Sequence, residues 1–154
     1  MVYPVVGDWR ISSPYGDRVL NGEKQFHDGV DFAGSIDNTV VSIADGVVVY
    51  DQDDYEEALR WVDKHHSAGN MVILRHVVEE RIYYARYLHL IKNFVGKGDT
   101  VYEGGLIGTY GDVGYSFGAH LHFDLYDETW KKLNPMDLLG KIDLTEEFYE
   151  EEQY

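Results

Sequence analysis

Short runs of β-branched and aromatic residues, separated by turn residues, make up most of the chain. Residues 40–43 and 47–50 are two such runs, and Ala44-Asp45-Gly46 between them is a turn signal. The other expected strands cover residues 71–75, 81–87, 106–107 and 120–126. Short strands with glycine-containing turns at this density predict a mainly β fold, with an antiparallel sheet or sandwich as its core.

Two segments follow a helical pattern instead. Between residues 53 and 65, apolar residues recur at spacings of three and four, namely Tyr55, Ala58, Leu59 and Val62. This pattern predicts an amphipathic helical insertion whose acidic first turn suits the helix dipole. A short C-terminal helix is expected near residues 135–140. Because we find no internal repeat or linker, we expect residues 1–154 to form a single domain with an acidic extension at about 141–154.

Composition limits the chemistry that the chain can perform. The absence of cysteine excludes a disulfide framework and a thiolate zinc site, so a metal site must use His, Asp and Glu. The net charge of −15 opposes binding to nucleic acid and anionic membranes. We expect no signal peptide and no transmembrane helix, because no apolar stretch approaches the ~20 residues that a span needs. The chain is then cytoplasmic, cut from a larger protein, or delivered by another route.

His27 and Asp31 lie four residues apart in Phe-His-Asp-Gly-Val-Asp-Phe. In a straight strand the two side chains would be ~13 Å apart, too far to share one zinc ion. A bend at Asp28-Gly29, a strong turn dipeptide, would bring them together. Nitrogen and oxygen ligands suit a catalytic zinc site, although this motif alone is weak evidence for one.

The other histidines allow more than one interpretation. His120 and His122 alternate along an expected strand, so both project from the same face and can line one site. A pair of exposed structural histidines is about equally common. His89 lies between leucines, where a buried core histidine is the commoner role. Structural or surface roles are expected for the remaining three, His65, His66 and His76.

Taken together and in order, these motifs resemble the lysostaphin-type, LytM-like zinc endopeptidases, which cut peptide bonds in bacterial peptidoglycan. The matching motifs are Tyr-Gly-Asp-Arg at 15–18, His-Asp-Gly-Val-Asp at 27–31, the strand pair around Ala-Asp-Gly at 44–46, residues 69–76, Tyr-Leu-His-Leu at 87–90, the Gly-Asp-Thr-Val hairpin at 97–108, and Gly-Ala-His-Leu-His-Phe at 118–123. Several motifs in one order are far more specific than any one of them.

The resemblance implies a ligand set and a catalytic pair. His27, Asp31 and His122 would bind one Zn²⁺, which leaves a fourth position for water. His89 and His120 would be the catalytic pair, one taking a proton from that water and the other supporting the developing oxyanion; their division of labour stays open. The substrate would be a peptide of peptidoglycan, in a cross-bridge or a stem peptide. The place of action would be extracellular, at the cell envelope or on a virion, as in phage tail lysins and endolysins, with other modules or targeting components as partners.

Three alternatives remain. The same fold serves inactive scaffolds, but all five family positions are filled here, which favours an enzyme. A structural component of a cell wall or phage tail could also carry this domain. A lipoyl- or biotinyl-type carrier shares the Gly-Asp-x-Val hairpin but leaves the histidines unexplained. The helical insertion is longer than the loop expected in the family, and we expect it to lie at the rim of the substrate groove.

Overall fold

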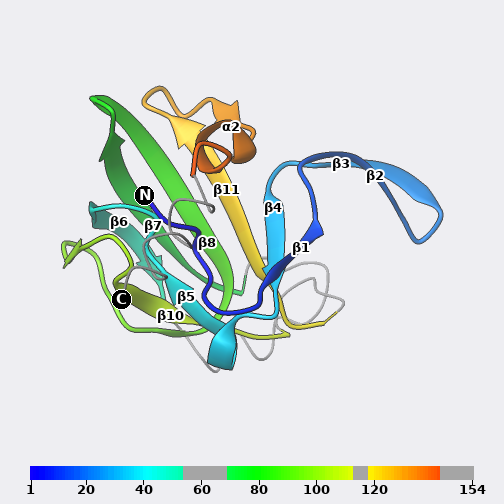
Figure 1. Ribbon diagram of the computed structural model, residues 1–154, viewed down its shortest axis with the longest axis horizontal. Helices are drawn as coiled ribbons and strands as arrows, with labels where there is room; N and C mark the ends of the chain where they lie inside the picture. Colours follow the sequence, from blue (N-terminus) through cyan, green and yellow to red (C-terminus); the bar gives the residue numbers. More distant parts are fainter. Residues whose placement is uncertain (54–68, 113–117, 143–154) are drawn as a thin grey trace, which may run out of the picture.

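The computed structural model of the protein describes residues 1–53, 69–112 and 118–142 (Figure 1). The predicted helix at 53–65, apart from its first residue, and most of the predicted acidic extension at 141–154 lie outside these residues. The described part is mainly β, as predicted, with one large antiparallel sheet, one short α-helix and one 3₁₀ turn. None of its helices is both long and apolar enough to cross a membrane.

The large sheet contains ten strands, with β8 and β11 near its centre. Its strands are β1 Arg10–Ser13, β4 Val30–Ala33, β5 Thr39–Val41, β6 Gly46–Gln52, β7 Asn70–Val78, β8 Arg81–Asn93, β9 Thr100–Val101, β10 Leu106–Tyr110, β11 Leu121–Asp127 and β12 Lys132–Leu133. The 3₁₀ turn η1 is Ile36–Asn38, and α2, Met136–Leu139, is the predicted C-terminal helix. The order β1-β4-β11-β8-β7-β6-β9 places segments far apart in sequence next to each other.

Alternation of buried and exposed residues explains how the sheet forms its core. Along β7 every second residue from Asn70 to His76 is buried, which is the period of a strand with one covered face. The core side chains with less than 2% exposure include Phe32, Leu74, Tyr87, Leu90, Ile107, Leu121, Phe123 and Leu125. The tight turn between β7 and β8 has positive φ at Glu79 and Glu80, as in the two-residue hairpins that match strand twist.

A second, two-stranded sheet extends away from the body as a hairpin arm (Figure 1). It consists of β2 Gly16–Leu20 and β3 Glu23–His27, joined at Asn21 and Gly22, which both have positive φ. The arm is absent from the predicted strands, although Asn-Gly is the strongest short-range hairpin signal. It matters for the site because its last residue is His27.

Register across β4, β11 and β8 places polar residues side by side. Asp31 on β4 is directly opposite His122 on β11. Asp124, two residues further along β11, is directly opposite Arg86 on β8. Residues two apart on a strand share a face, so His122 and Asp124 project the same way. The pairing of the three strands therefore fixes the relative positions of four polar residues: Asp31, His122, Asp124 and Arg86.

Candidate metal centre

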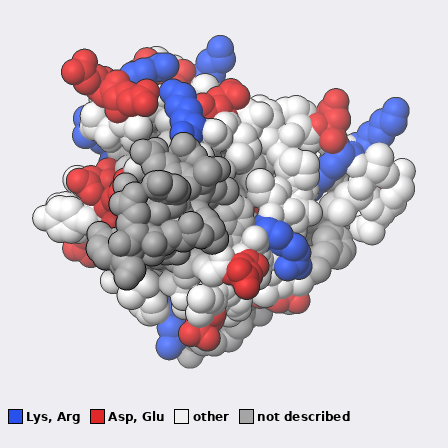
Figure 2. Space-filling view, viewed as in Figure 1, with Lys and Arg blue, Asp and Glu red and all other residues white. Residues whose placement is uncertain are grey.

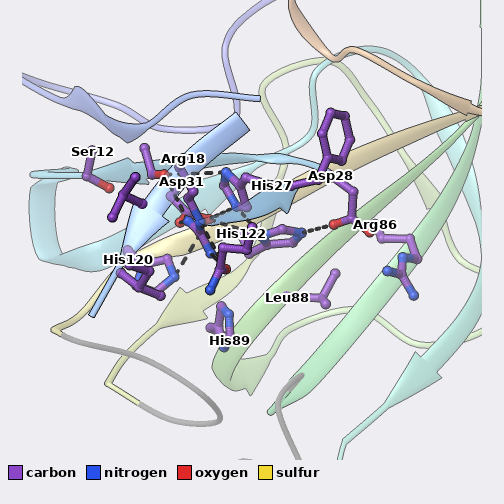
Figure 3. Close-up of a pocket in the computed structure, with 15 residues that line it drawn as sticks. Ser12, Arg18, His27, Asp28, Asp31, Arg86, Leu88, His89, His120 and His122 are labelled. Atoms are coloured by element: carbon purple, nitrogen blue, oxygen red, sulfur yellow. Dashed lines mark hydrogen bonds and ion pairs between the residues drawn. The ribbon is translucent and has the colours of Figure 1, made fainter. Parts of the chain in front are cut away.

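Three side-chain atoms converge between the arm and the large sheet (Figure 3). His27 Nε2 lies 3.3 Å from Asp31 Oδ1 and 3.3 Å from His122 Nδ1, and His122 Nδ1 lies 3.0 Å from Asp31 Oδ1. All three residues are largely buried. The structure thus brings together the three residues that the resemblance implied as zinc ligands.

The triangle has the dimensions of a zinc site. Zinc bonds to His nitrogen and carboxylate oxygen are ~2.0–2.2 Å long, and in a tetrahedron this places the ligand atoms about 3.3 Å apart. Two imidazoles and one carboxylate are also a donor set found in catalytic zinc sites, which keep a fourth position open. The residues present therefore fit a zinc ion in both spacing and chemistry.

Hydrogen bonds behind the ligand atoms point lone pairs at the centre. The Nδ1–H of His27 donates to the Pro14 carbonyl at 2.9 Å, which leaves Nε2 as the unprotonated atom. The Nε2–H of His122 donates to Asp124 Oδ2 at 3.1 Å, so in the neutral ring Nδ1 is the unprotonated atom. A carbonyl and a carboxylate only accept, so these two contacts hold a proton on His27 Nδ1 and on His122 Nε2. When both rings are neutral, these two lone pairs face each other at 3.3 Å, a spacing that suits a metal ion between them.

A bend in the backbone makes the convergence possible. The chain turns at Gly29, between the end of β3 and the start of β4, as the Asp28-Gly29 pair indicated. A Cβ atom on Gly29 would lie 2.6 Å from two ring atoms of His122 and 2.7 Å from the Phe123 carbonyl. The glycine is therefore needed because the His122 ring packs directly against the backbone.

The charges of the cluster are strongly coupled. Burial alone would raise the pKa of Asp31, but hydrogen bonds with His122 and His27 hold it well below its usual range. Burial favours the neutral ring of His122, yet hydrogen bonds to Asp124 and Asp31 raise its pKa to about 9 in the metal-free protein. Zinc requires a neutral imidazole, so metal binding at neutral pH displaces a proton from this ring.

His89 and His120 lie beside the three converging residues. Their ring centroids are 4.7 Å apart, and the His89 ring is 6.0 Å from that of His122. The Nδ1–H of His120 donates to the Gly118 carbonyl at 2.9 Å, and its Nε2 lies 3.7 Å from Asp31 Oδ1. His120 precedes β11 rather than beginning it, a small departure from the predicted strand.

His89 owes its direction to an irregularity in β8. This strand continues to Asn93 instead of ending at residue 87, and its pairing with β7 shifts between Leu88 and Leu90. His89 is the extra residue of this bulge and has a φ of 66°. The left-handed region is costly for a residue with a Cβ, and bulges near active sites redirect side chains. The bulge aims His89 at the other histidines.

An open groove of about 650 Å³ passes over the cluster. The arm forms one wall, where Val19 and Phe26 are 65% and 57% exposed. Arg18 reaches from the arm to the site: it donates to Ser13 Oγ and Gln25 Oε1, and its Nη1 lies 3.6 Å from Asp31 Oδ2. The His and Asp side chains of the cluster line this groove and are reached from it.

A second group of potential ligands, Asp28, His122 and Asp124, lies on the other side of the His122 ring. Each of its carboxylates already pairs with a cation, Asp28 with Lys132 at 2.6 Å and Asp124 with Arg86 at 2.7 Å. These pairs disfavour a second metal ion. Figure 2 shows basic side chains lying among acidic ones, without a continuous basic patch on the face in view.

The fold and the site together define a β-sheet protein with the donor set of a catalytic zinc centre beneath an open groove. The sequence matches Peptidase family M23 over residues 25–135, and the chain belongs to this family. ShyA, a peptidoglycan DD-endopeptidase of Vibrio cholerae, is 39% identical over 126 residues, 80% of this chain and 26% of the relative. The chain thus spans about a quarter of the length of this curated relative.

Solved structures show the same similarity. A zinc-containing peptidase from Vibrio cholerae has a TM-score of 0.67 at 34% identity, over 92% of this chain and 39% of that one. The catalytic domain of lysostaphin from Staphylococcus simulans has a TM-score of 0.68 at 29% identity, over 87% and 94%. The SpoIIQ–SpoIIIAH pore-forming complex has a TM-score of 0.70 at 21% identity, over 95% and 94%, which shows a shared fold alone.

Three residues of the site were not among the sequence candidates: Arg18, Arg86 and Asp124. For Asp124 a signal existed, because the alternation that pairs His120 with His122 continues to it. Arg18 belongs to the Tyr-Gly-Asp-Arg motif, but its reach to Asp31 depends on the fold of the arm. Arg86 carries no local signal, since only the pairing of β8 with β11 places it opposite Asp124.

Proposed function

We propose that this chain is the catalytic module of a zinc-dependent endopeptidase that hydrolyses peptide bonds in bacterial peptidoglycan. One observation carries the proposal: His27 Nε2, Asp31 Oδ1 and His122 Nδ1 lie 3.0–3.3 Å from one another under an open groove. These three residues would hold the zinc ion. When bound, zinc would lower the pKa of a water molecule and polarise the scissile carbonyl.

The other residues of the site suit the remaining tasks of hydrolysis. The Nδ1–H of His120 is engaged by the Gly118 carbonyl, and its Nε2 faces the cluster, a geometry that suits it to take a proton from the attacking water. His89, aimed from the β8 bulge, would donate a hydrogen bond to the developing oxyanion. Arg18 would hold the outer oxygen of Asp31 and leave Oδ1 for the metal.

The substrate class rests on the relatives. ShyA is named a peptidoglycan DD-endopeptidase and lysostaphin an antimicrobial peptidase. We propose that this chain acts at the cell envelope or outside the cell, within a longer protein whose other parts direct it to the wall. The exposed apolar side chains of the arm, Val19 and Phe26, would contact the peptide in the groove, beside the scissile bond.

Zinc content and hydrolysis of purified peptidoglycan test the proposal. The wild type is expected to bind one zinc ion per chain and to release soluble muropeptides. His122→Ala is expected to lose both, and Lys97→Ala, which changes an exposed residue outside the groove, neither. A wild type that binds no zinc, or that cleaves no better than His122→Ala, would refute the proposal. Directly cross-linked and glycine-bridged substrates, compared in parallel, identify the bond that is cut.

A further inference from the structure

We propose that Asp124, held by Arg86, is a positioning residue that sets the proton and the orientation of the His122 ring for metal binding. The proposal rests on the zinc site proposed above and assigns a role to two residues outside the ligand set. Asp124 has no solvent exposure, and a buried carboxylate at this place needs a reason. Its contacts supply one.

The contacts form a continuous line from β8 to the cluster. Arg86 donates from Nε to Asp124 Oδ1 and from Nη2 to Oδ2, both at 2.7 Å. The same Oδ2 accepts the Nε2–H of His122 at 3.1 Å. The opposite nitrogen of that ring, Nδ1, faces Asp31 and His27. Asp124 thus holds the His122 ring through Nε2, the ring nitrogen on the side away from the metal site.

The two hydrogen bonds from Arg86 hold the Asp124 carboxylate in one orientation. Two parallel N–H···O bonds fix the plane of the carboxylate, and both partners are directly opposite each other on adjacent strands. Because a carboxylate only accepts, Asp124 keeps the proton of the neutral His122 ring on Nε2, which leaves the lone pair of Nδ1 for the metal. Carboxylates behind ligating histidines act in this way in metal sites, and their loss typically lowers metal affinity by about 10–100-fold.

Asp124→Asn breaks this arrangement with little change in size. In the wild type, three N–H groups, two from Arg86 and one from His122, share the two acceptor oxygens of Asp124. An amide offers one oxygen and an NH₂ group, so at least one of these donors would face another donor. Removal of the Arg86 donors as well, in Arg86→Met with Asp124→Asn, frees the amide oxygen to accept from His122.

Asp28 provides a matched control for charge alone. Its Oδ1 lies 4.0 Å from the same His122 Nε2, without a hydrogen bond, and its side chain is half exposed. Asp28→Asn removes the same charge from nearly the same place. If Asp124 acted only through its charge, the two substitutions would have similar effects.

Zinc affinity, measured by competition with a chromophoric zinc chelator, tests the proposal on the full chain. Asp124→Asn is expected to bind zinc about 10–100-fold more weakly than the wild type, and Asp28→Asn within about threefold of it. The double variant is expected to bind more tightly than Asp124→Asn alone. Circular dichroism of the metal-free variants checks that the fold is retained.

Three results would each overturn the proposal: unchanged affinity in Asp124→Asn, an equal loss in Asp28→Asn, or no recovery in the double variant. If Asp124→Asn does not fold, NMR of the zinc-loaded wild type still tests the proposal. A slowly exchanging His122 Nε2 proton supports the proposal, and a rapidly exchanging one refutes it. A wild type that binds no zinc refutes the proposed function. A wild type that binds zinc no more tightly than Asp124→Asn refutes only this inference.

Discussion

Acid is expected to destabilise the folded protein through His76, a buried histidine away from the groove. Its Nδ1–H donates to the Asp45 carbonyl at 3.0 Å, and its Nε2 accepts from the Tyr87 hydroxyl at 3.1 Å. The ring has no solvent exposure. Burial lowers its pKa from 6.5 to about 4 and outweighs the hydrogen bonds to Asp45 and Ala44, which raise it.

The shift converts into a loss of stability with a defined sign. Between pH 6.5 and 4, the unfolded chain binds a proton at this position and the folded chain does not, so stability falls as the pH falls. Each pKa unit corresponds to about 1.4 kcal/mol, and the fall from 6.5 to about 4 therefore costs about 3 kcal/mol. This stability is fully present above pH 6.5.

Urea unfolding of the metal-free protein at a series of pH values from 7.5 to 4 measures the effect. EDTA in every sample removes the separate pH dependence of metal binding. His76→Gln cannot titrate, so the difference in unfolding free energy between wild type and variant is expected to shrink by about 3 kcal/mol across this range. Parallel curves for the two proteins would refute the argument that burial keeps His76 neutral.

Three further changes test the site and its backbone. His89→Gly is expected to be about 1 kcal/mol more stable than His89→Ala in urea unfolding, because φ is 66° there; equal stabilities would contradict the strain. Gly29→Ala is expected to cost about 1–3 kcal/mol and to weaken zinc binding, whereas Gly96→Ala, with only Asp51 Oδ2 near at 3.8 Å, should change stability by less than about 0.5 kcal/mol. Zinc at a hundred times its dissociation constant is expected to raise unfolding free energy by about 2.7 kcal/mol, and EDTA to reverse this in thermal unfolding; an unchanged Tm would argue against a metal site in the folded state.

Local patterns were enough to predict six of the twelve strands of the described residues and part of the site. The β-branched runs correspond to β5, β6, β7 and β10, because alternation and turn residues act over a few positions. The bend between His27 and Asp31 follows from one dipeptide, and both side chains meet at 3.3 Å. The strand at 120–126 is shifted by a single residue, so His122 faces the site as alternation requires.

What local patterns could not supply is the pairing between distant strands. Asp31 and His122 are opposite each other only because β4 and β11 are neighbours, and nothing near either residue states this. The same holds for Arg86 and Asp124 on β8 and β11. The bulge at His89 is also invisible in the pattern Tyr-Leu-His-Leu, which reads as regular strand, since the extra residue shows only against the partner strand.

Ion pairs around the cluster show how a chain with a large negative charge can keep the surroundings of the proposed metal site close to neutral. Three carboxylates approach the histidines, and each has its own cation: Asp31 with Arg18, Asp124 with Arg86, and Asp28 with Lys132. These pairs cancel locally, so the net charge of −15 resides elsewhere on the protein. A divalent ion bound by His27, Asp31 and His122 would then leave the floor of the groove positive. Under the proposed function, such a field would favour the developing oxyanion of a cleaved peptide, while the rest of the molecule repels polyanions.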